Sequence, residues 1–379
     1  MKGEGIQRPP MRQDPIEFDE DQPGPILRAP LTMLDEDAVR LALAGGSVVE
    51  WNRLSFRTHD DVNRFLRLWG CDLQNDGWAR ERVRYVYNQA VEYLEEHIGL
   101  HFAPEVRRPR DVRDAFLRAS MRERFSRHRI QYCAILKLVH VINHLEMQEL
   151  RNQTALRELD LLELANHKVG EAARRMREEG LPVEAFYGNR KTRPSVITKL
   201  LAKRQSTAAT VFDKLRFRIV TAEREDIVSC IAWLFRNLVP FPAVIPGESL
   251  NQLLSAAELE IDGHYDGERR TLGLQRQAAF NANPDSGGDY HVINFIVGLP
   301  VRISDVVGVS APRHRAVLGD VVSVLTEFQV VDRHSEEANE RGDSRHDLYK
   351  DRQMQKVYER LGRTMPPSRA PVDGEPGSR

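Results

Sequence analysis

Apolar residues recur at helical spacing through residues 31–182. The segment Ala79–Ile98 repeats apolar side chains every three or four residues, which predicts a helix with one buried face. The members of that face are Val83, Val86, Ala90, Val91 and Leu94. Arg127–Met147 has a similar spacing and is more apolar, so we expect a buried helix there. Two amphipathic stretches, Ala155–Ala165 and Lys168–Glu179, follow before a Gly-Leu-Pro break.

From about residue 184 the pattern changes to helices that alternate with β-branched runs. Strands are predicted at Leu215–Val220, Tyr290–Val297 and Val321–Val331. Helices are predicted at Ser195–Arg204, Asp226–Leu238 and Asp347–Leu361. This alternation predicts an α/β (α+β) fold, with a mixed sheet flanked by helices and preceded by a mainly helical N-terminal region. We expect the boundary between the two near residue 182, with domains at 31–182 and 184–361.

Polar side chains divide the last predicted strand into two faces. Glu327 and Gln329 are two residues apart and share one face, whereas Val324, Phe328 and Val330 lie mostly on the other. A lone acid on a strand is usually just solvated. A second acid, Asp213, begins the first strand, and basic residues open the preceding helix. Together they suggest a site for a Mg²⁺-nucleotide complex, in which acids hold the metal and bases balance the phosphates.

Composition excludes several classes of protein. The chain has 379 residues, enough for two domains, and 55 basic against 56 acidic residues, a net charge of −1. No global field therefore indicates nucleic acid or an anionic membrane as a partner. Three distant cysteines, Cys71, Cys133 and Cys230, exclude a disulfide framework and indicate a reducing compartment. Without a signal peptide or a long apolar run, we expect a cytoplasmic protein with no membrane partner. Residues 1–30 and 362–379 are rich in Pro, Gly and charge and are predicted to be disordered tails.

Three weaker motifs have structural explanations. His140 and His144 have the i, i+4 spacing of zinc ligands but lack the Glu of H-E-x-x-H, so a packed pair is favoured. The triplet that begins at His59 has no partner motif for a metal-dependent phosphohydrolase and is interpreted as a helix N-cap. The segment that begins at Asp285, D-S-G-G, lacks the Lys of a phosphate-binding loop and is interpreted as a turn before the Tyr290 strand.

Five short motifs stand in a fixed order over roughly 175 residues. The first, KTRPSVITKL, places Lys191 and Lys199 eight residues apart, just over two helical turns, so that both can flank one groove. The others are DKLRFRIV from Asp213, PAVIPG from Pro242, DYHVIN from Asp289 and EFQVVDRHSEEANERGDSRHDLYK, which begins one residue before Phe328. In this order they resemble the synthetase domain of the RelA/SpoT alarmone enzymes, a nucleotidyltransferase-like domain. In the last motif the matching residues are Glu327, Gln329, Glu340, Gly342, His346, Tyr349 and Lys350.

The resemblance implies Mg²⁺-dependent transfer of pyrophosphate from ATP to the 3′-hydroxyl of a guanine nucleotide. An alternative is transfer to another acceptor, such as tRNA. Asp213 and Glu327 would bind the metal and carry catalysis. The residues implied to bind ATP and its phosphates are Lys191, Ser195, Lys199 and Arg218. Those implied on the acceptor side are Tyr290, which would stack on the base, Asn294 and Gln329.

Most departures from the family pattern fall in the acceptor half. The family's Gly in the Asp strand is Arg216, its His after the Tyr is Asn294, and a phosphate-binding base corresponds to Ser286. Two further departures are Asn189 and Val331. About 43 residues separate Gly247 from Tyr290, more than in the family. That segment carries three arginines that could replace the missing base, namely Arg269, Arg270 and Arg276.

These departures leave an alternative open. The chain could be a catalytically inactive nucleotide-binding or interaction module of the same fold. The acceptor, the role of residues 31–182 and the oligomeric state, a homo-oligomer included, are also left open.

Overall fold

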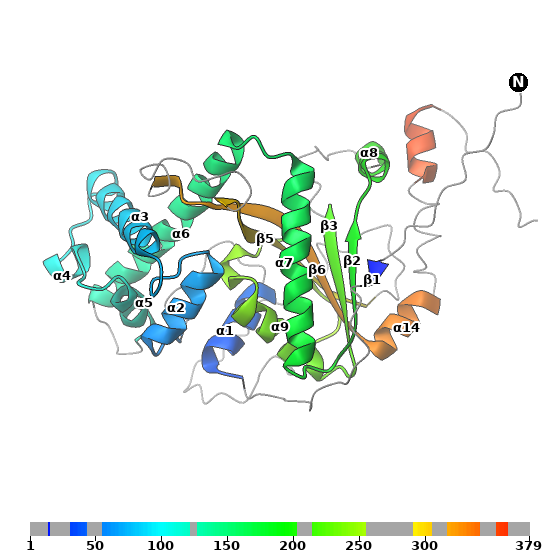
Figure 1. Ribbon diagram of the computed structural model, residues 1–379, viewed down its shortest axis with the longest axis horizontal. Coiled ribbons are helices and arrows are strands. Elements are labelled where there is room, and N and C mark those ends of the chain that lie inside the picture. The colour runs from blue at the N-terminus through cyan, green and yellow to red at the C-terminus, as the bar shows by residue number, and fades with distance from the viewer. Residues whose placement is uncertain are drawn as a thin grey trace, which may run out of the picture.

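A six-stranded mixed sheet flanked by helices forms one half of the molecule, and helices form the other (Figure 1). The computed structural model describes residues 14–15, 31–43, 55–121, 127–202, 214–254, 291–304, 317–341 and 354–362. The strands are β1 (Asp14–Pro15), β2 (Val183–Arg190), β3 (Leu215–Thr221), β4 (Leu250–Asn251), β5 (Ile293–Arg302) and β6 (Val321–Asp332). Their order is β1-β2-β3-β6-β5-β4. Only β3 and β6 pair in parallel, so the sheet is mixed, as the sequence predicts.

The N-terminal region is helical, as predicted. Its helices are α1 (Met33–Leu43), α2 (His59–Leu68), α3 (Gly77–Glu96), α4 (Pro104–Arg107), α5 (Arg113–Ser120), α6 (Arg127–Gln153) and α7 (Glu158–Glu178). Four of the five side chains predicted to form the buried face of α3 are buried, whereas Val83 is only half-buried. The helices within and after the sheet are α8 (Arg193–Ala202), α9 (Asp226–Asn237), a short 3₁₀ turn η3 (Phe241–Ala243) and α14 (Arg333–Arg341).

Several predicted boundaries were wrong. The two stretches Ala155–Ala165 and Lys168–Glu179 are one continuous helix, α7. The strand predicted at Tyr290–Val297 begins at Ile293 and runs on to Arg302. Neither β2 nor α14 was predicted from the sequence. Of the helix predicted at Asp347–Leu361, residues 354–360 are helical and 347–353 lie outside the described residues. The tails predicted at 1–30 and 362–379 lie outside them too, apart from β1 and the turn residue Gly362.

One face of the sheet is apolar and carries a row of phenylalanines. Phe186 of β2, Phe217 of β3, Phe328 of β6 and Phe295 of β5 follow one another, with neighbouring ring centroids 5.7–6.0 Å apart. Phe235 of α9 continues the row, 5.5 Å from Phe295. The four strand residues are at most 1% exposed, so this face forms the core beneath α7 and α9 (Figure 1).

The helical region is tied to the sheet through β6 and the residues before it. Arg82 of α3 forms an ion pair with Glu146 of α6 at 2.5 Å and donates to the carbonyl of Val317. Arg302 of β5 pairs with Asp320 at 2.6 Å and donates to the carbonyl of Gly70 at 2.5 Å. The buried apolar side chains of both regions belong to one continuous cluster. The helical region therefore supports the sheet, while its role beyond packing stays open.

Among the described helices, none combines the length and apolar character that a membrane span needs. The three cysteines are free thiols. Burial raises the pKa of Cys71 to about 11, and that of Cys230 to about 12, so both thiols stay protonated at neutral pH.

Candidate functional site

Polar side chains occupy the other face of the central strands. In the parallel β3–β6 pair, Arg216 lies beside Glu327 and Arg218 lies beside Gln329. In the antiparallel β5–β6 pair, Asn294 lies beside Gln329. Residues paired in register point to the same side of a sheet, so these five side chains share one face. The sequence predicted that Glu327 and Gln329 share a face opposite Phe328, and this is confirmed.

Glu327 is the centre of a hydrogen-bond network on this face. Arg216 donates from Nε to Oε2 of Glu327 at 2.8 Å. The amides of Asn294 and Gln329 donate from Nδ2 and Nε2 to Oε1 of Glu327, each at 3.0 Å. Glu327 is only 3% exposed. A buried carboxylate is costly unless it is paired, and here a guanidinium neutralises it while two amides satisfy its other oxygen.

A second ion pair lies next to this network. Arg218 pairs with Glu336 of α14, with Nη2 of the arginine 2.7 Å from Oε2 of the glutamate. Burial raises the pKa of Glu336 above its ordinary value, and Arg218 offsets part of that rise. The Asn339 amide holds α14 further, because it accepts from the His291 backbone N–H and donates to the His291 carbonyl, both at 2.9 Å. α14 therefore packs against the Arg218 end of the polar face.

Lys191 lies at the N-terminal end of β3. It directly follows β2, and its backbone N–H donates to the carbonyl of Lys214 at 2.9 Å. Lys214 directly precedes β3, and Arg216 is the second residue of that strand. Ser195 and Lys199 lie on α8, which begins just beyond Lys191 and lies over the ends of β2 and β3 in Figure 1. The hydroxyl of Ser195, in the first turn of α8, is 3.1 Å from that of Thr192, which directly precedes the helix.

Several predicted site residues lie outside the described residues. Asp213 directly precedes the segment that begins at Lys214, and Tyr290 directly precedes the one that begins at His291. The expected approach of Asp213 to Glu327 therefore stays a prediction. The same holds for the turn at Asp285 and for other residues of the motifs and the long insertion, namely Arg269, Arg270, Arg276, Ser286, Gly342, His346, Tyr349 and Lys350.

The described residues do not fit Mg²⁺ at Glu327. The metal prefers several carboxylate or carbonyl oxygens around it. Here three hydrogen-bond donors, one of them cationic, point at the two oxygens of Glu327. Within the part of the chain that the structure describes, no group of three or more His, Cys, Asp or Glu side chains could hold a metal ion. A dication placed beside Glu327 would also meet the like charge of Arg216.

Two of the weaker sequence motifs have packing roles. The ring of His140 meets Trp69 edge-on, with centroids 6.0 Å apart. Burial lowers the pKa of His140 to about 4, helped by the nearby His144, so the ring is neutral at pH 7. This contact agrees with the packed interpretation of the histidine pair.

The interpretation of the His59 triplet as the N-cap itself was wrong by one residue. Thr58 caps α2, its hydroxyl accepting from the Asp61 N–H at 3.1 Å while Asp61 accepts from the Thr58 N–H at 3.0 Å. The triplet therefore forms the first turn of the helix, and Asp61 completes a capping box.

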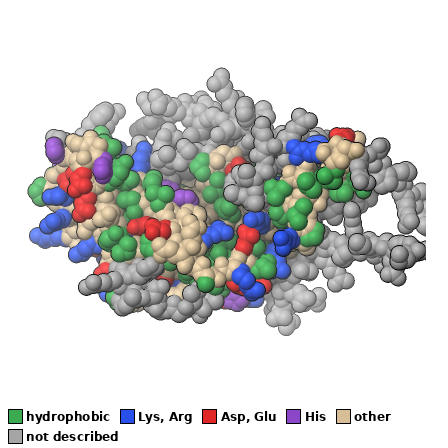
Figure 2. Space-filling view, turned by 90° about the horizontal axis from the view of Figure 1, so that it is seen from above, with side chains coloured by type: hydrophobic (Ala, Val, Ile, Leu, Met, Phe, Trp, Pro, Cys, Tyr) green, Lys and Arg blue, Asp and Glu red, His purple; other side chains and the backbone are tan. Residues whose placement is uncertain are grey.

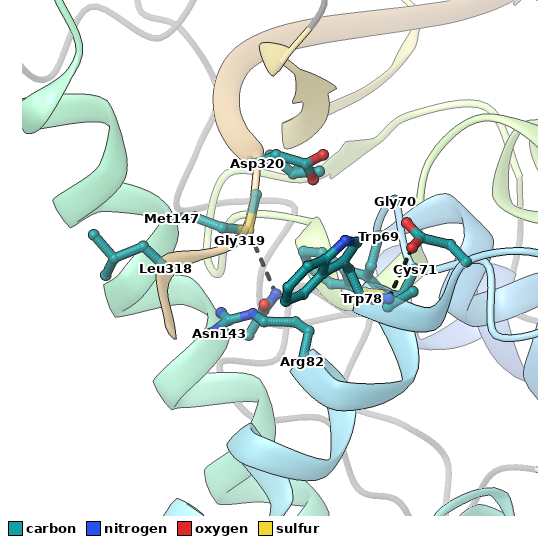
Figure 3. A pocket seen from close by; sticks show the side chains of 13 residues that line it. Trp69, Gly70, Cys71, Trp78, Arg82, Asn143, Met147, Leu318, Gly319 and Asp320 are labelled. Carbon is teal, nitrogen blue, oxygen red and sulfur yellow. Dashed lines mark hydrogen bonds between the residues drawn. The ribbon is translucent and has the colours of Figure 1, made fainter. Parts of the chain in front are cut away.

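A small pocket lies away from the polar face, between α3, α6 and the residues that lead into β6 (Figure 3). Trp69, Trp78, Arg82 and Asp320 are among its lining residues. Its volume of about 30 Å³ has room for about one water molecule, far below the several hundred Å³ of a typical ligand site. We therefore do not assign a nucleotide to it. Figure 2 shows basic and acidic side chains interspersed on the face in view, without one large basic patch.

Two residues that organise the polar face were not assigned a role from the sequence. Arg216 was noted only as a departure from a family glycine, and Glu336 was not singled out. One signal for Arg216 was present: in LRFRIV the two arginines alternate with apolar residues, which places both on one face of the strand. Glu336 offered no such signal, because its helix was not predicted.

Comparison with known proteins adds no family to this description. No family model matches the chain, and a search of curated proteins gave no match. The resemblance to RelA/SpoT synthetase domains therefore rests on the order of the motifs and on the residues that they place on the polar face.

Proposed function

We propose that the polar face of the sheet binds the phosphates of a nucleoside polyphosphate, with ATP as the ligand that the motifs imply. The observation that carries this proposal is the convergence of Arg216, Asn294 and Gln329 on Glu327, with the Arg218–Glu336 pair beside them on the same face of the sheet. Such buried polar networks cost stability, and they are characteristic of sites that bind or react. Guanidinium and amide donors are the groups that recognise phosphate oxygens, and Lys191 would add a third cation at the edge of this face.

The Arg216–Glu327 pair favours a binding module without transferase activity. A carboxylate that accepts a guanidinium hydrogen bond at 2.8 Å is neither poised to deprotonate a hydroxyl nor turned toward a metal. In this proposal the chain binds a nucleotide. A partner then recognises either the bound nucleotide or the conformation that the protein adopts with it.

A second candidate is Mg²⁺-dependent pyrophosphate transfer from ATP to the 3′-hydroxyl of a guanine nucleotide, or of tRNA. It is favoured by the position of Glu327, Gln329 and Asn294 on one face, the arrangement that the synthetase resemblance implies. It requires Arg216 to leave Glu327, and it requires Asp213 to supply a second acid. A cytoplasmic location, where ATP and guanine nucleotides are abundant, belongs to both candidates.

One experiment separates the candidates. Purified protein is titrated with ATP by calorimetry, then incubated with γ-labelled ATP, Mg²⁺ and GDP, GTP or bulk tRNA, and the products are separated. ATP binding without label transfer supports the binding module. Transfer that Glu327→Gln abolishes, and that Glu95→Gln leaves unchanged, supports the transferase. Glu95 is a suitable control because it pairs with Arg107 in the helical region, at 2.9 Å. Failure of the wild-type protein to bind ATP contradicts both candidates.

A further inference from the structure

Arg216 covers a carboxylate that is otherwise shut away from water. The Glu327 side chain is 4% exposed, whereas that of Arg216 is 31% exposed, so the arginine forms the solvent side of the pair. The two charges cancel locally.

A second observation concerns the amide oxygens beside this acid. Oδ1 of Asn294 is buried and has no hydrogen-bond partner within the described part of the chain, although Nδ2 of the same amide donates to Glu327. A buried carbonyl-type oxygen without a donor is unusual. Amide oxygens from Asn294 and Gln329, after rotation of the amides, together with the Glu327 carboxylate, would make an oxygen ligand set that suits a hard divalent cation.

We propose that Arg216 is a built-in cation that takes the place of a divalent metal at Glu327, so that the polar face works without a metal. The guanidinium supplies the positive charge that the carboxylate needs, and it repels a dication twice as strongly as it would repel a monovalent ion. Without Arg216, Glu327 is a buried charge that needs a new partner, and rotation of the two neighbouring amides would turn their oxygens toward one. One consequence, that nucleotide binding needs no divalent ion, rests on the proposed function. The prediction that loss of Arg216 creates a metal site at Glu327 does not depend on that function.

The first test uses the metal alone, without nucleotide. Mn²⁺ binding is measured from the free Mn²⁺ signal in electron paramagnetic resonance, for wild-type protein, Arg216→Gln, Arg216→Gly and the double variant Arg216→Gln/Glu327→Gln. The matched control is Arg107→Gln, which removes an arginine from the ion pair with Glu95. Circular dichroism and thermal melting establish that each variant is folded. Arg216→Gln removes the charge but keeps a polar side chain, whereas Arg216→Gly removes the whole side chain, so Arg216→Gln is the variant expected to retain the fold.

We expect the wild-type protein and Arg107→Gln to bind Mn²⁺ at least tenfold more weakly than the Arg216 variants, and the double variant to lose the gain. Wild-type protein that binds Mn²⁺ tightly, with the binding abolished by Glu327→Gln, would overturn the proposal. So would a folded Arg216→Gln variant that binds Mn²⁺ no better than wild type.

The second test concerns the nucleotide. ATP affinity of the wild-type protein is measured in excess EDTA and in excess Mg²⁺, and we expect the two values to agree within about threefold. A loss of tenfold or more in EDTA would overturn metal independence. If the wild-type protein binds no ATP in either condition while Arg216→Gln gains Mn²⁺ binding, the proposed function fails and the role of Arg216 stands.

Discussion

Arg218 of β3 and Glu336 of α14 form an ion pair at 2.7 Å in which the side chains are only 10% and 18% exposed. The pair holds α14, a helix with few apolar residues, against the polar face of the sheet. Because both charges are largely buried, each depends on the other, and removing one leaves the other uncompensated. The same arginine is the one that the synthetase resemblance assigns to ATP phosphates, so its structural and binding roles have to be separated.

A double-mutant cycle separates them. Arg218→Gln or Glu336→Gln alone should lower the free energy of unfolding by about 2–3 kcal/mol, because each leaves a buried charge. The double variant should lose clearly less than the sum of the two. Urea unfolding measures these values. ATP affinity, measured on the same proteins, should stay low in the double variant, since restored stability does not restore a phosphate ligand. A double variant that binds ATP as wild type does would assign Arg218 a structural role alone.

Lys191, just before α8, and Lys199, within it, should affect ATP binding more than folding. Lys191→Ala and Lys199→Ala should each weaken ATP binding about ten- to a hundredfold, since a hydrogen bond to a charged group is worth about 1.5–3 kcal/mol. The matched control is Lys137→Ala, which removes an exposed lysine from α6. Calorimetric titration at low and at high salt checks the result. Equal affinities in all three variants would remove the basic helix start from the binding site.

Half-buried His140 should make the stability of the protein sensitive to acid. The pKa of His140 is about 4 in the folded protein and ordinarily 6.5, so between these values the unfolded chain binds more protons. Stability contributed by the neutral ring is therefore complete above pH 6.5 and is lost as the pH falls toward 4. From pH 7.5 to pH 5, wild-type protein should lose about 1–2 kcal/mol more than His140→Phe, which keeps an aromatic ring beside Trp69. Urea unfolding at the two pH values tests this. Parallel losses in both proteins would show that His140 titrates normally.

The phenylalanine row should dominate the stability of the sheet. Phe328 is 0% exposed and stacks between Phe217 and Phe295, with centroids 5.7 Å from each. Phe328→Ala should lower the free energy of unfolding by about 3–5 kcal/mol, the usual cost of such a cavity. Leu361→Ala is the control, because Leu361 is 56% exposed and should change stability by less than about 0.5 kcal/mol. A loss below about 1 kcal/mol for Phe328→Ala would mean that the row packs loosely.

The elements that are best predicted from the sequence are those whose side chains follow a clear burial pattern. β3 and β6 are almost fully buried runs of β-branched and aromatic residues, and α9 is a strongly apolar helix, so all three were predicted nearly in place. β2 was missed because only one of its residues, Phe186, is buried. α14 was missed because charges and hydrogen bonds hold it, whereas sequence patterns report apolar stripes.

The prediction of two separate stretches in place of the single helix α7 also has a physical reason. Asn166 and His167 look like an interruption between two amphipathic stretches, yet both are exposed on the outer side of one helix. The buried residues Leu162, Ala165, Val169 and Ala172 continue at helical spacing across them.

The candidate site could be predicted only in part. The shared face of Glu327 and Gln329 follows from a period of two along one strand. The Arg216–Glu327 contact joins residues 111 positions apart, and it depends on the parallel register of β3 and β6, which no local pattern contains. The order of motifs could suggest that two strands meet, but not which side chains would face each other.

The phenylalanine row also has a consequence for how this protein could change over time. Because alternate residues of a strand point to opposite sides, sliding β3 by one position against β6 would bring Phe217 to the polar side and an arginine into the core. Tight packing of the rings therefore fixes the register of the two strands, and with it the positions of the side chains on the polar face. Substitutions among the polar residues of the opposite face, Arg216 among them, can therefore accumulate without shifting the strands.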